Sequence, residues 1–410
     1  MSSVPSAGQV RRRRVFYIPG YDPIHPRRYR ELYRKESAEQ ARISGYSVTL
    51  KPKTTKGPYG WHVSSEQEGE AVAADVEVLV WSDIVRGSMS NTIPATYAQL
   101  ARTAWTYIAS GVLWRLMRLR KGPVIAALYP VGMLLAQLLA ALLLVWLGWR
   151  LGGLTGLPWV ALIGLVLGLA AGVYLLRWFR SKDGTFFAYY LMHDYAYSAR
   201  WRGANPPELE ARIGEFADRI AEALSGEADE VLVVGHSSGA HVGVSVLADL
   251  IRAGRVPADG PALGFLTLGQ VVPMVSFLPE AQRLRADLHF LCTRDELAWV
   301  DVSAPGDGCA FALCDPVSVS GVAPATGKRW PLVLSAAFTQ TLSAARWAEL
   351  RWRFFRLHFQ YLCAFDRVGD YDYFRITAGP QTLAARYRDR APSKSRIDRA
   401  VSKYTDMGAA

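Results

Sequence analysis

The fold of this chain is indicated by residues 231–243, which read VLVVGHSSGAHVG. The first four residues, Val231–Val234, form a continuous apolar and β-branched run that is too short for a helix and typical of a buried strand. The run leads directly into the pattern Gly-x-Ser-x-Gly at 235–239. In this pattern the serine lies on a sharp turn between a strand and a helix, where only small neighbours fit. The stretch predicts a strand, a tight turn that carries Ser237, and a helix.

The sequence on either side alternates between helical and strand-like segments. Before the turn, apolar residues recur at helical spacing from Leu209 to Leu224, and after it we expect the helix to continue to about Arg252. Further strands are predicted at 15–18, 47–50, 76–81, 264–268 and 288–292, and a helix at 27–44 that ends at Gly45. This alternation is the pattern of an α/β fold with a mostly parallel sheet and helices on both faces.

Two long apolar segments interrupt this pattern. The only charged residue between 122 and 176 is Arg150, with a long uncharged run on each side of it. Each run exceeds the roughly 20 residues that a helix needs to cross the hydrocarbon core of a bilayer. We expect a hairpin of two transmembrane helices, at about 124–147 and 157–176. The alternative is a buried helical hairpin of a soluble protein.

Basic residues flank the hairpin on its two outer sides. They are Arg115, Arg118, Arg120 and Lys121 before it, and Arg177, Arg180 and Lys182 after it. By the positive-inside rule, both outer ends are cytoplasmic and the short connecting loop lies on the far side of the membrane. We therefore expect an integral membrane protein, of the bacterial inner-membrane type, with both termini and the α/β domain in the cytoplasm.

Because both ends of the hairpin share one compartment, the segments before and after it can build a single domain. We expect a basic N-terminal tail at 1–14, the two parts of that domain at 15–110 and 183–390, the hairpin with its flanks at 111–182, and a polar, basic and poorly ordered tail at 391–410. The first tail has no apolar core after its basic run, which argues against a cleaved signal peptide.

The formal net charge is +11. Part of this charge comes from the basic residues that flank the hairpin, whose expected role is to set its orientation in the membrane. No nucleic-acid recognition motif is present, so nucleic acid is not an expected partner. The four cysteines show no spacing typical of a metal site. We expect neither a metal nor an organic cofactor.

Residues Val231 to Gly243 resemble the nucleophile elbow of the α/β-hydrolase superfamily, and the alternation of strands around them is similar too. The resemblance implies an α/β-hydrolase-type sheet and a triad in the chain order serine, acid, histidine, with Ser237 as the nucleophile. The alternative is a tight turn between a strand and a helix with no catalytic role.

Chain order narrows the choice of the catalytic histidine. Of the seven histidines, only His289 and His358 follow Ser237 at a useful distance, and His289 falls inside a predicted strand. This leaves His358 as the base; the alternative is a histidine on an aromatic, arginine-rich helix without catalytic function. His236 and His241 flank the serine, but adjacency in a turn does not bring an imidazole to the hydroxyl.

Three aspartates qualify as the triad acid, because each follows the strand predicted at 288–292. Asp307 lies between two glycines after a proline, in an exposed turn, and is favoured; Asp295 and Asp301 are the alternatives. The acid would hold the imidazole in the required tautomer. For the oxyanion hole, the resemblance implies the backbone amides of Ser238 and of Tyr21 in the loop Pro19–Asp22, where typical members carry His-Gly and this chain has Pro-Gly.

The sequence thus favours a membrane-anchored serine hydrolase that cleaves an ester or thioester, with membrane lipids as partners and a small-molecule or lipid-derived ester as substrate. Two alternatives remain open: an acyltransferase with the same triad, and a non-catalytic binding protein on a hydrolase scaffold. The identity of the substrate and the oligomeric state are not encoded in any recognisable motif.

Overall fold

The computed structural model describes residues 8–53, 57–89 and 92–408. The chain divides into two compact units. Unit 1 contains residues 1–87, 112–123 and 201–410, and unit 2 contains residues 88–111 and 124–200. The segments before and after the inserted region therefore do build one unit together.

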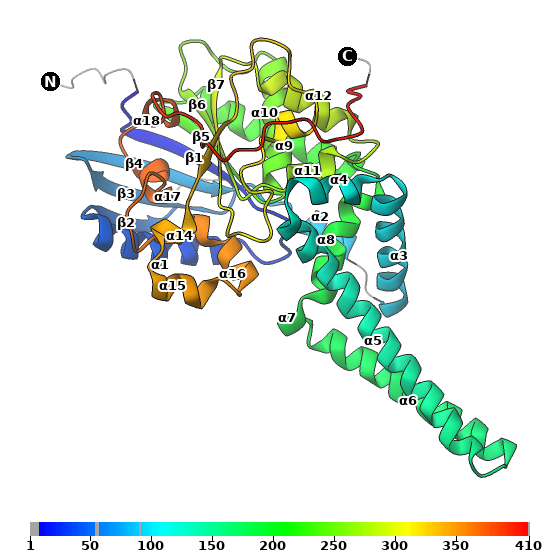
Figure 1. The fold of residues 1–410 in the computed structure, drawn as a ribbon. Coiled ribbons are helices and arrows are strands. Elements are labelled where there is room, and N and C mark those ends of the chain that lie inside the picture. The colour runs from blue at the N-terminus through cyan, green and yellow to red at the C-terminus, as the bar shows by residue number, and fades with distance from the viewer. Residues whose placement is uncertain (1–7, 54–56, 90–91, 409–410) are drawn as a thin grey trace. The chain divides into compact units, whose positions relative to one another are not determined.

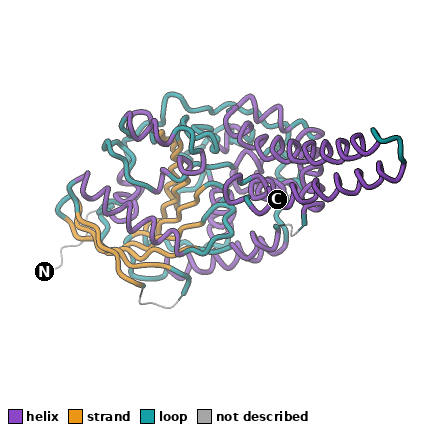
Figure 2. Tube along the Cα trace, turned by 90° about the horizontal axis from the view of Figure 1, so that it is seen from below, coloured by secondary structure: helices purple, strands orange, loops and turns teal. Residues whose placement is uncertain are grey.

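Unit 1 is an α/β unit around an eight-stranded sheet with the order β2-β3-β4-β1-β5-β6-β7-β8. Figure 1 and Figure 2 show the strands as one continuous twisted layer. The strands are β1 (Arg12–Ile18), β2 (Ser47–Pro52), β3 (Gly60–Gln67), β4 (Glu70–Val78), β5 (Glu230–His236), β6 (Ala262–Leu268), β7 (Leu297–Ser303) and β8 (Leu332–Ser335).

The sheet is mostly parallel. From β4 to β8 all neighbouring strands run parallel, whereas β2, β3 and β4 form an antiparallel meander at one edge. The central strand β1 pairs with β4 in the register Val15↔Val76 and with β5 in the register Val15↔Leu232. The segment before the insertion therefore supplies one half of the sheet and the segment after it supplies the other.

Helices cover both faces of this sheet (Figure 1). Those of unit 1 are α1 (Arg27–Ser44), α2 (Ser82–Ser88), α4 (Val112–Leu119), α9 (Pro207–Leu224), α10 (Gly239–Arg252), α11 (Val272–Ser276), α12 (Gln282–Leu291), α13 (Pro316–Val319), α14 (Phe338–Thr341), α15 (Ala344–Leu350), α16 (Phe354–His358), η1 (Gln360–Leu362), α17 (Tyr373–Ala378) and α18 (Leu383–Arg386). The predicted helix at 27–44 is confirmed, and Gly45 closes it at φ 73° with an N–H bond to the Ala41 carbonyl.

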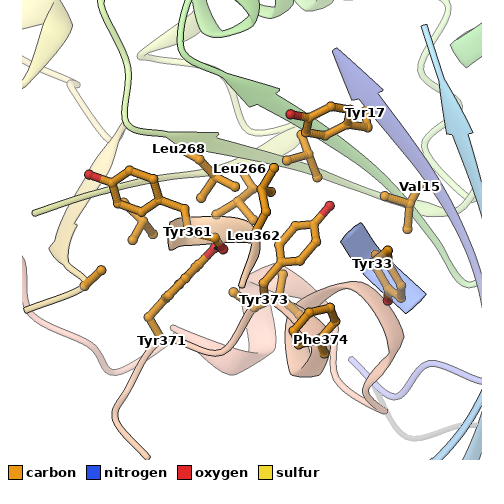
Figure 3. Packing of buried hydrophobic residues seen from close by; sticks show 14 of the residues in the cluster. Val15, Tyr17, Tyr33, Leu266, Leu268, Tyr361, Leu362, Tyr371, Tyr373 and Phe374 are labelled. Carbon is orange, nitrogen blue, oxygen red and sulfur yellow. Dashed lines mark hydrogen bonds between the residues drawn. The ribbon is translucent and has the colours of Figure 1, made fainter. Parts of the chain in front are cut away.

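An aromatic cluster fills the space between one face of the sheet and the C-terminal helices. Alternate residues of β1, Val15 and Tyr17, point into it because side chains of a strand alternate between its two faces. In Figure 3, Tyr33 and Phe374 lie on the side of Val15 and Tyr17, and Tyr361 lies farther along, beside Leu268. Since every residue of the cluster is nearly or fully buried, it fixes the segment after β8 firmly on the sheet.

The prediction of a strand at 288–292 is wrong, because these residues form the last turn of α12 and the short segment that follows it. Leu284, Leu288 and Leu291 of this helix are buried at helical spacing, which stabilises a helix against the unit. The strand that follows the helix is β7, so Asp301 lies within a strand and Asp307 lies in the loop after it.

The described part of the C-terminal tail is bound to unit 1, contrary to the expectation of poor order. The Ile397 N–H donates to the Leu313 carbonyl at 2.7 Å, and the Ser393 N–H donates to the Val333 carbonyl at 2.9 Å. At the N-terminal side, the predicted strand at 76–81 is the end of β4, and β3 has no counterpart among the predicted strands.

Unit 2 contains α3 (Ile93–Ala109), α5 (Lys121–Gly153, of which the first turn belongs to unit 1), α6 (Pro158–Ser181), α7 (Asp183–Phe186) and α8 (Ala188–Arg200). Helices α5 and α6 are long and apolar enough to cross a membrane, with a mean hydropathy of 2.3 in their most apolar windows. Only 17% and 11% of these windows are buried, unlike the core helices of a soluble protein.

Glycines bring α5 and α6 into close contact along one seam. A Cβ added at Gly148 would lie 2.3 Å from the Gly164 carbonyl oxygen, and one at Gly164 would lie 2.1 Å from the Gly148 oxygen. Similar contacts join Gly152 to Val160 and Gly168 to Leu144. Small residues at such positions allow two helix backbones to approach, as is typical of helix pairs in membranes.

Candidate active site

Ser237 occupies the turn between β5 and α10, and its backbone has φ +56°. This left-handed conformation is uncommon for a residue with a side chain and is typical of strained functional positions. The flanking glycines are sterically required: a Cβ at Gly239 would lie 2.1 Å from the Ile18 carbonyl oxygen, and one at Gly235 would lie 2.7 Å from the Gly239 oxygen. The turn thus has the geometry that the Gly-x-Ser-x-Gly pattern predicts.

His358 and Asp307 form a buried pair. His358 Nδ1 lies 2.7 Å from Asp307 Oδ2, and the exposed fractions of the two residues are 6% and 2%. Asp307 lies in the loop after β7, and His358 is the last residue of α16. The structure therefore brings together the histidine and the acid favoured from the sequence.

Asp307 receives further hydrogen bonds from its own loop and from the helical turn after His358. The Tyr361 hydroxyl donates to Asp307 Oδ2 at 3.0 Å and accepts the Ala304 N–H at 3.0 Å. The Cys309 N–H donates to Asp307 Oδ1 at 2.9 Å. Both carboxylate oxygens therefore have partners, which fix the orientation in which the carboxylate meets the imidazole.

The electrostatics of Asp307 favour its charged form. Burial by itself raises the pKa of this carboxyl group, but the charge of His358 and the hydrogen bonds from His358, Cys309 and Tyr361 outweigh it, so the pKa lies below its usual value. An ionised Asp307 accepts a hydrogen bond from Nδ1–H of His358, which leaves Nε2 as the basic nitrogen.

His236, the residue before Ser237, contacts the backbone of His358. Its Nε2 lies 3.0 Å from the His358 carbonyl oxygen, and the two rings are 4.9 Å apart. Because a carbonyl can only accept, His236 Nε2 carries the hydrogen. Burial, and secondly the charge of His358, lowers the pKa of His236 to about 3, so this ring stays neutral. His236 therefore holds the backbone of His358 in place through this hydrogen bond.

Two glycines leave room around the serine and the histidine. A Cβ at Gly269 would lie 3.2 Å from His358 Cε1, and one at Gly20 would lie 3.4 Å from Ser237 Oγ. Gly269 directly follows Leu268, whose carbonyl accepts the Ser237 N–H at 2.9 Å. The ends of β1, β5 and β6 therefore meet around Ser237, and the His358 ring lies over the residue that follows β6.

The two alternative acids lie elsewhere. Asp295 is exposed, precedes β7 and forms an ion pair with Arg329. Asp301 is fully buried within β7, and its Oδ1 accepts the Thr267 hydroxyl at 2.6 Å. Burial raises the pKa of Asp301 to about 7. Neither carboxylate is hydrogen-bonded to His358, so the geometry favours Asp307.

Ser238 and Tyr21, the two residues expected to form the oxyanion hole, are both buried. Ser238 follows Ser237 at the start of α10 and is buried. Tyr21 is buried in the loop after β1, with its ring 6.2 Å from that of Trp81. The loop is fixed by Asp22, which accepts the Tyr29 hydroxyl at 2.5 Å and the Ile24 N–H at 2.9 Å. Its Gly20 approaches Ser237, as noted above.

The remaining histidines have other surroundings. His289 lies on α12, not on a strand, with its Nδ1 2.8 Å from the Val322 carbonyl oxygen. His241 is buried in α10, and burial lowers its pKa to about 4. His62 pairs with Asp75 on the meander. His193 lies on α8 in unit 2, with its Nδ1 2.7 Å from Gln99 Oε1.

Sequence reasoning missed three residues that shape the site: His236, Tyr361 and Gly269. Tyr361 is three residues after His358, a spacing at which side chains of one helical turn share a face, so a signal for it was present. His236 was considered only as a base. Nothing in the local sequence distinguishes Gly269 from other glycines that follow strands.

Within residues 8–53, 57–89 and 92–408, one group of side chains has donor atoms close enough to hold a metal ion. It consists of Asp307, Cys309 and His358, and its ligand atoms all lie within 4.8 Å of one another.

In comparisons with known proteins, no family model, no curated protein and no solved structure matches this chain. The chemistry of the site is therefore argued from its own geometry.

Proposed function

We propose that this protein is a membrane-anchored serine hydrolase that cleaves an ester or thioester, with Ser237 as nucleophile, His358 as general base and Asp307 as the orienting acid. The observation that supports this most directly is the combination of a strained serine turn with a buried, ionised aspartate that is hydrogen-bonded to a histidine. The chain order serine, acid, histidine agrees with that of α/β-hydrolases, which supports the assignment of this sheet to that fold.

In the proposed reaction, His358 Nε2 removes the proton of Ser237 Oγ as the oxygen attacks the carbonyl carbon of the substrate. The imidazolium that forms is stabilised by Asp307, whose pKa is below its usual value. His358 then gives the proton to the leaving alcohol or thiol, and the acyl group remains on Ser237. A water molecule, activated by the same histidine, releases the acid and restores the serine.

The oxyanion of the tetrahedral intermediate needs two hydrogen-bond donors. We assign these to the backbone N–H groups of Ser238 and Tyr21, because the first follows the nucleophile and the second lies in the loop whose Gly20 approaches Ser237.

The hairpin supports a membrane location for this reaction. Helices α5 and α6 span a membrane in the proposal, with both flanks and both termini in the cytoplasm according to the distribution of basic residues. A catalytic unit that is tethered in this way acts on amphiphilic esters present in or near the bilayer.

An activity-based fluorophosphonate probe tests the proposal, because it labels only serines that are activated as nucleophiles. Membranes with the wild-type protein are compared with Ser237→Ala and His358→Ala, and His289→Ala serves as the control histidine outside the site. We expect labelling in the wild type and the control and none in the two site variants. A folded wild-type protein that takes up no label would contradict the hydrolase proposal and favour a non-catalytic binding protein.

A further inference from the structure

We propose that Asp307, Cys309 and His358 form an inhibitory site for a zinc ion. Their ligand atoms lie within 4.8 Å of one another at the acid side of the candidate triad. A carboxylate, a thiolate and an imidazole are the three ligand types that bind zinc in proteins. This site uses two of the groups assigned to catalysis and adds Cys309, which the proposed hydrolysis does not use.

The separations suit a zinc ion after small shifts of the ligand atoms. Zinc binds sulfur at about 2.3 Å and nitrogen or oxygen at about 2.0–2.2 Å, so its ligand atoms lie roughly 3.2–3.8 Å from one another in a tetrahedral site. His358 Nδ1 and Asp307 Oδ2 are 2.7 Å apart and would have to separate slightly. The thiol would have to approach them by about an ångström at most.

The loop after β7 holds two of the ligands in a fixed relation. Asp307 and Cys309 are joined by the bond from the Cys309 N–H to Asp307 Oδ1, and the Asp307 N–H donates to the Ala304 carbonyl at 2.9 Å. His358 is held against them by α16 and η1. Cys309 is half-buried, whereas Asp307 and His358 are buried, so an ion reaches the group from the side of the thiol.

The charges balance when zinc binds. The Cys309 thiol releases its proton to solvent, and the thiolate together with the Asp307 carboxylate neutralises the two charges of the ion. The neutral imidazole of His358 binds through Nδ1, and the proton of that nitrogen is transferred to Nε2. Three protein ligands leave the fourth position to water, as in open zinc sites.

This exchange of the proton between the two ring nitrogens would inhibit the enzyme. With Nδ1 on the metal, the hydrogen bond to Asp307 is lost and Nε2 carries a hydrogen, so His358 cannot accept the proton of Ser237. Inhibition therefore rests on the proposed function, whereas metal binding does not.

The experiment uses the full chain in detergent and compares the wild type with Cys309→Ser and with Cys363→Ser, a matched control for a half-buried cysteine. Cadmium replaces zinc in one measurement, because the cadmium–thiolate bond gives an ultraviolet charge-transfer band. Zinc affinity and inhibition of fluorophosphonate labelling are measured in parallel, with reversal by a chelator. Melting curves confirm that both variants are folded.

We expect one equivalent of metal, the thiolate band and reversible inhibition in the wild type and in Cys363→Ser. In Cys309→Ser the band should disappear, zinc affinity should fall by about tenfold or more, and labelling should persist in zinc. An unchanged band in Cys309→Ser, or no band in the wild type, would overturn the site. A protein that shows the band but never takes up the fluorophosphonate would retain the metal site and lose the proposed function.

Discussion

Asp307 is the residue whose surroundings are most specific to a catalytic role. A buried carboxylate without a partner would become neutral, but this one is kept charged by His358 and by donors from its own loop and η1. Asp295, by contrast, is an exposed carboxylate paired with an arginine. The two aspartates are chemically identical, and their environments assign them different roles.

We therefore expect Asp307→Asn to reduce kcat by roughly 10⁴-fold, because the amide would favour the wrong tautomer of the imidazole. Hydrolysis of a chromogenic ester, or the rate of fluorophosphonate labelling, measures the effect. The exposed Asp295→Asn is the control and should retain wild-type activity. A similar loss in both variants would argue against Asp307 as the acid.

Ser237 is strained in a way that stability measurements can detect. At φ +56° a side chain costs about 1–2 kcal/mol, and glycine avoids this cost. We expect Ser237→Gly to exceed Ser237→Ala in free energy of unfolding by about 1 kcal/mol, measured by denaturant titration. At Ser238, where φ is −62°, the same comparison should have the opposite sign because glycine there only adds flexibility to the unfolded chain.

At the scale of elements, sequence patterns located the helix at 27–44 and the strand before Ser237, since strong periodicity and clear end signals occur there. They failed at 288–292, because a short apolar run such as LHFLC fits a strand or a helix equally, and the buried face of α12 decides in favour of the helix. β3 escaped detection because two of its four buried positions, Ser65 and Gln67, are polar, so the alternation of apolar and polar residues ends after Val63.

The residues of the candidate site also divide into those that the sequence could predict and those that it could not. The tight turn at Ser237 and the pairing of Asp307 with His358 could be predicted, because the Gly-x-Ser-x-Gly pattern and the chain order constrain them. The contribution of His236 could not, since it depends on a contact with the backbone of a residue 122 positions away. Such long-range contacts are set by the packing of the sheet and leave no trace in the local sequence.

The contact between α5 and α6 depends on glycines, which gives a prediction at the scale of elements. We expect Gly148→Leu to separate the two helices, because a side chain would collide with the Gly164 carbonyl 2.3 Å from its Cβ. Cysteine crosslinking across the seam, or the melting temperature in detergent, measures this. Gly132→Leu is the matched control on the same helix, since no atom lies within 4 Å of its Cβ. Equal behaviour of both variants would contradict the glycine seam.

At the scale of the whole molecule, neutral buried histidines make stability depend on pH. Burial lowers the pKa of His241 to about 4, so between pH 6.5 and 4 the unfolded chain binds a proton that the folded chain does not. The contribution of the neutral His241 ring to the free energy of unfolding is therefore fully present above about pH 6.5. It decreases as the pH falls toward 4. His236, with a pKa of about 3, and His193 in unit 2, with a pKa of about 4, act in the same direction.

We expect the loss of unfolding free energy between pH 7 and pH 5 to be about 2 kcal/mol smaller in His241→Gln than in the wild type, because glutamine does not titrate. Denaturant titrations at the two pH values give the difference. Val244→Ala, a buried substitution on the same helix that removes no titratable group, is the control and should show the wild-type pH dependence. An identical dependence in His241→Gln would mean that the pKa of this ring does not differ between the folded and unfolded states.

The central sheet joins two segments that the ribosome makes at different times. The Arg12 N–H of β1 donates to Asp229, which lies 217 residues later in the chain. The edge of β1 that pairs with β5 therefore has no partner until the whole insertion has been synthesised. In the proposed membrane topology, the N-terminal segment therefore keeps an unpaired central strand while α5 and α6 insert into the bilayer. The order of synthesis and this topology together place membrane insertion before the completion of unit 1, and a delay at that step would expose a strand edge to aggregation.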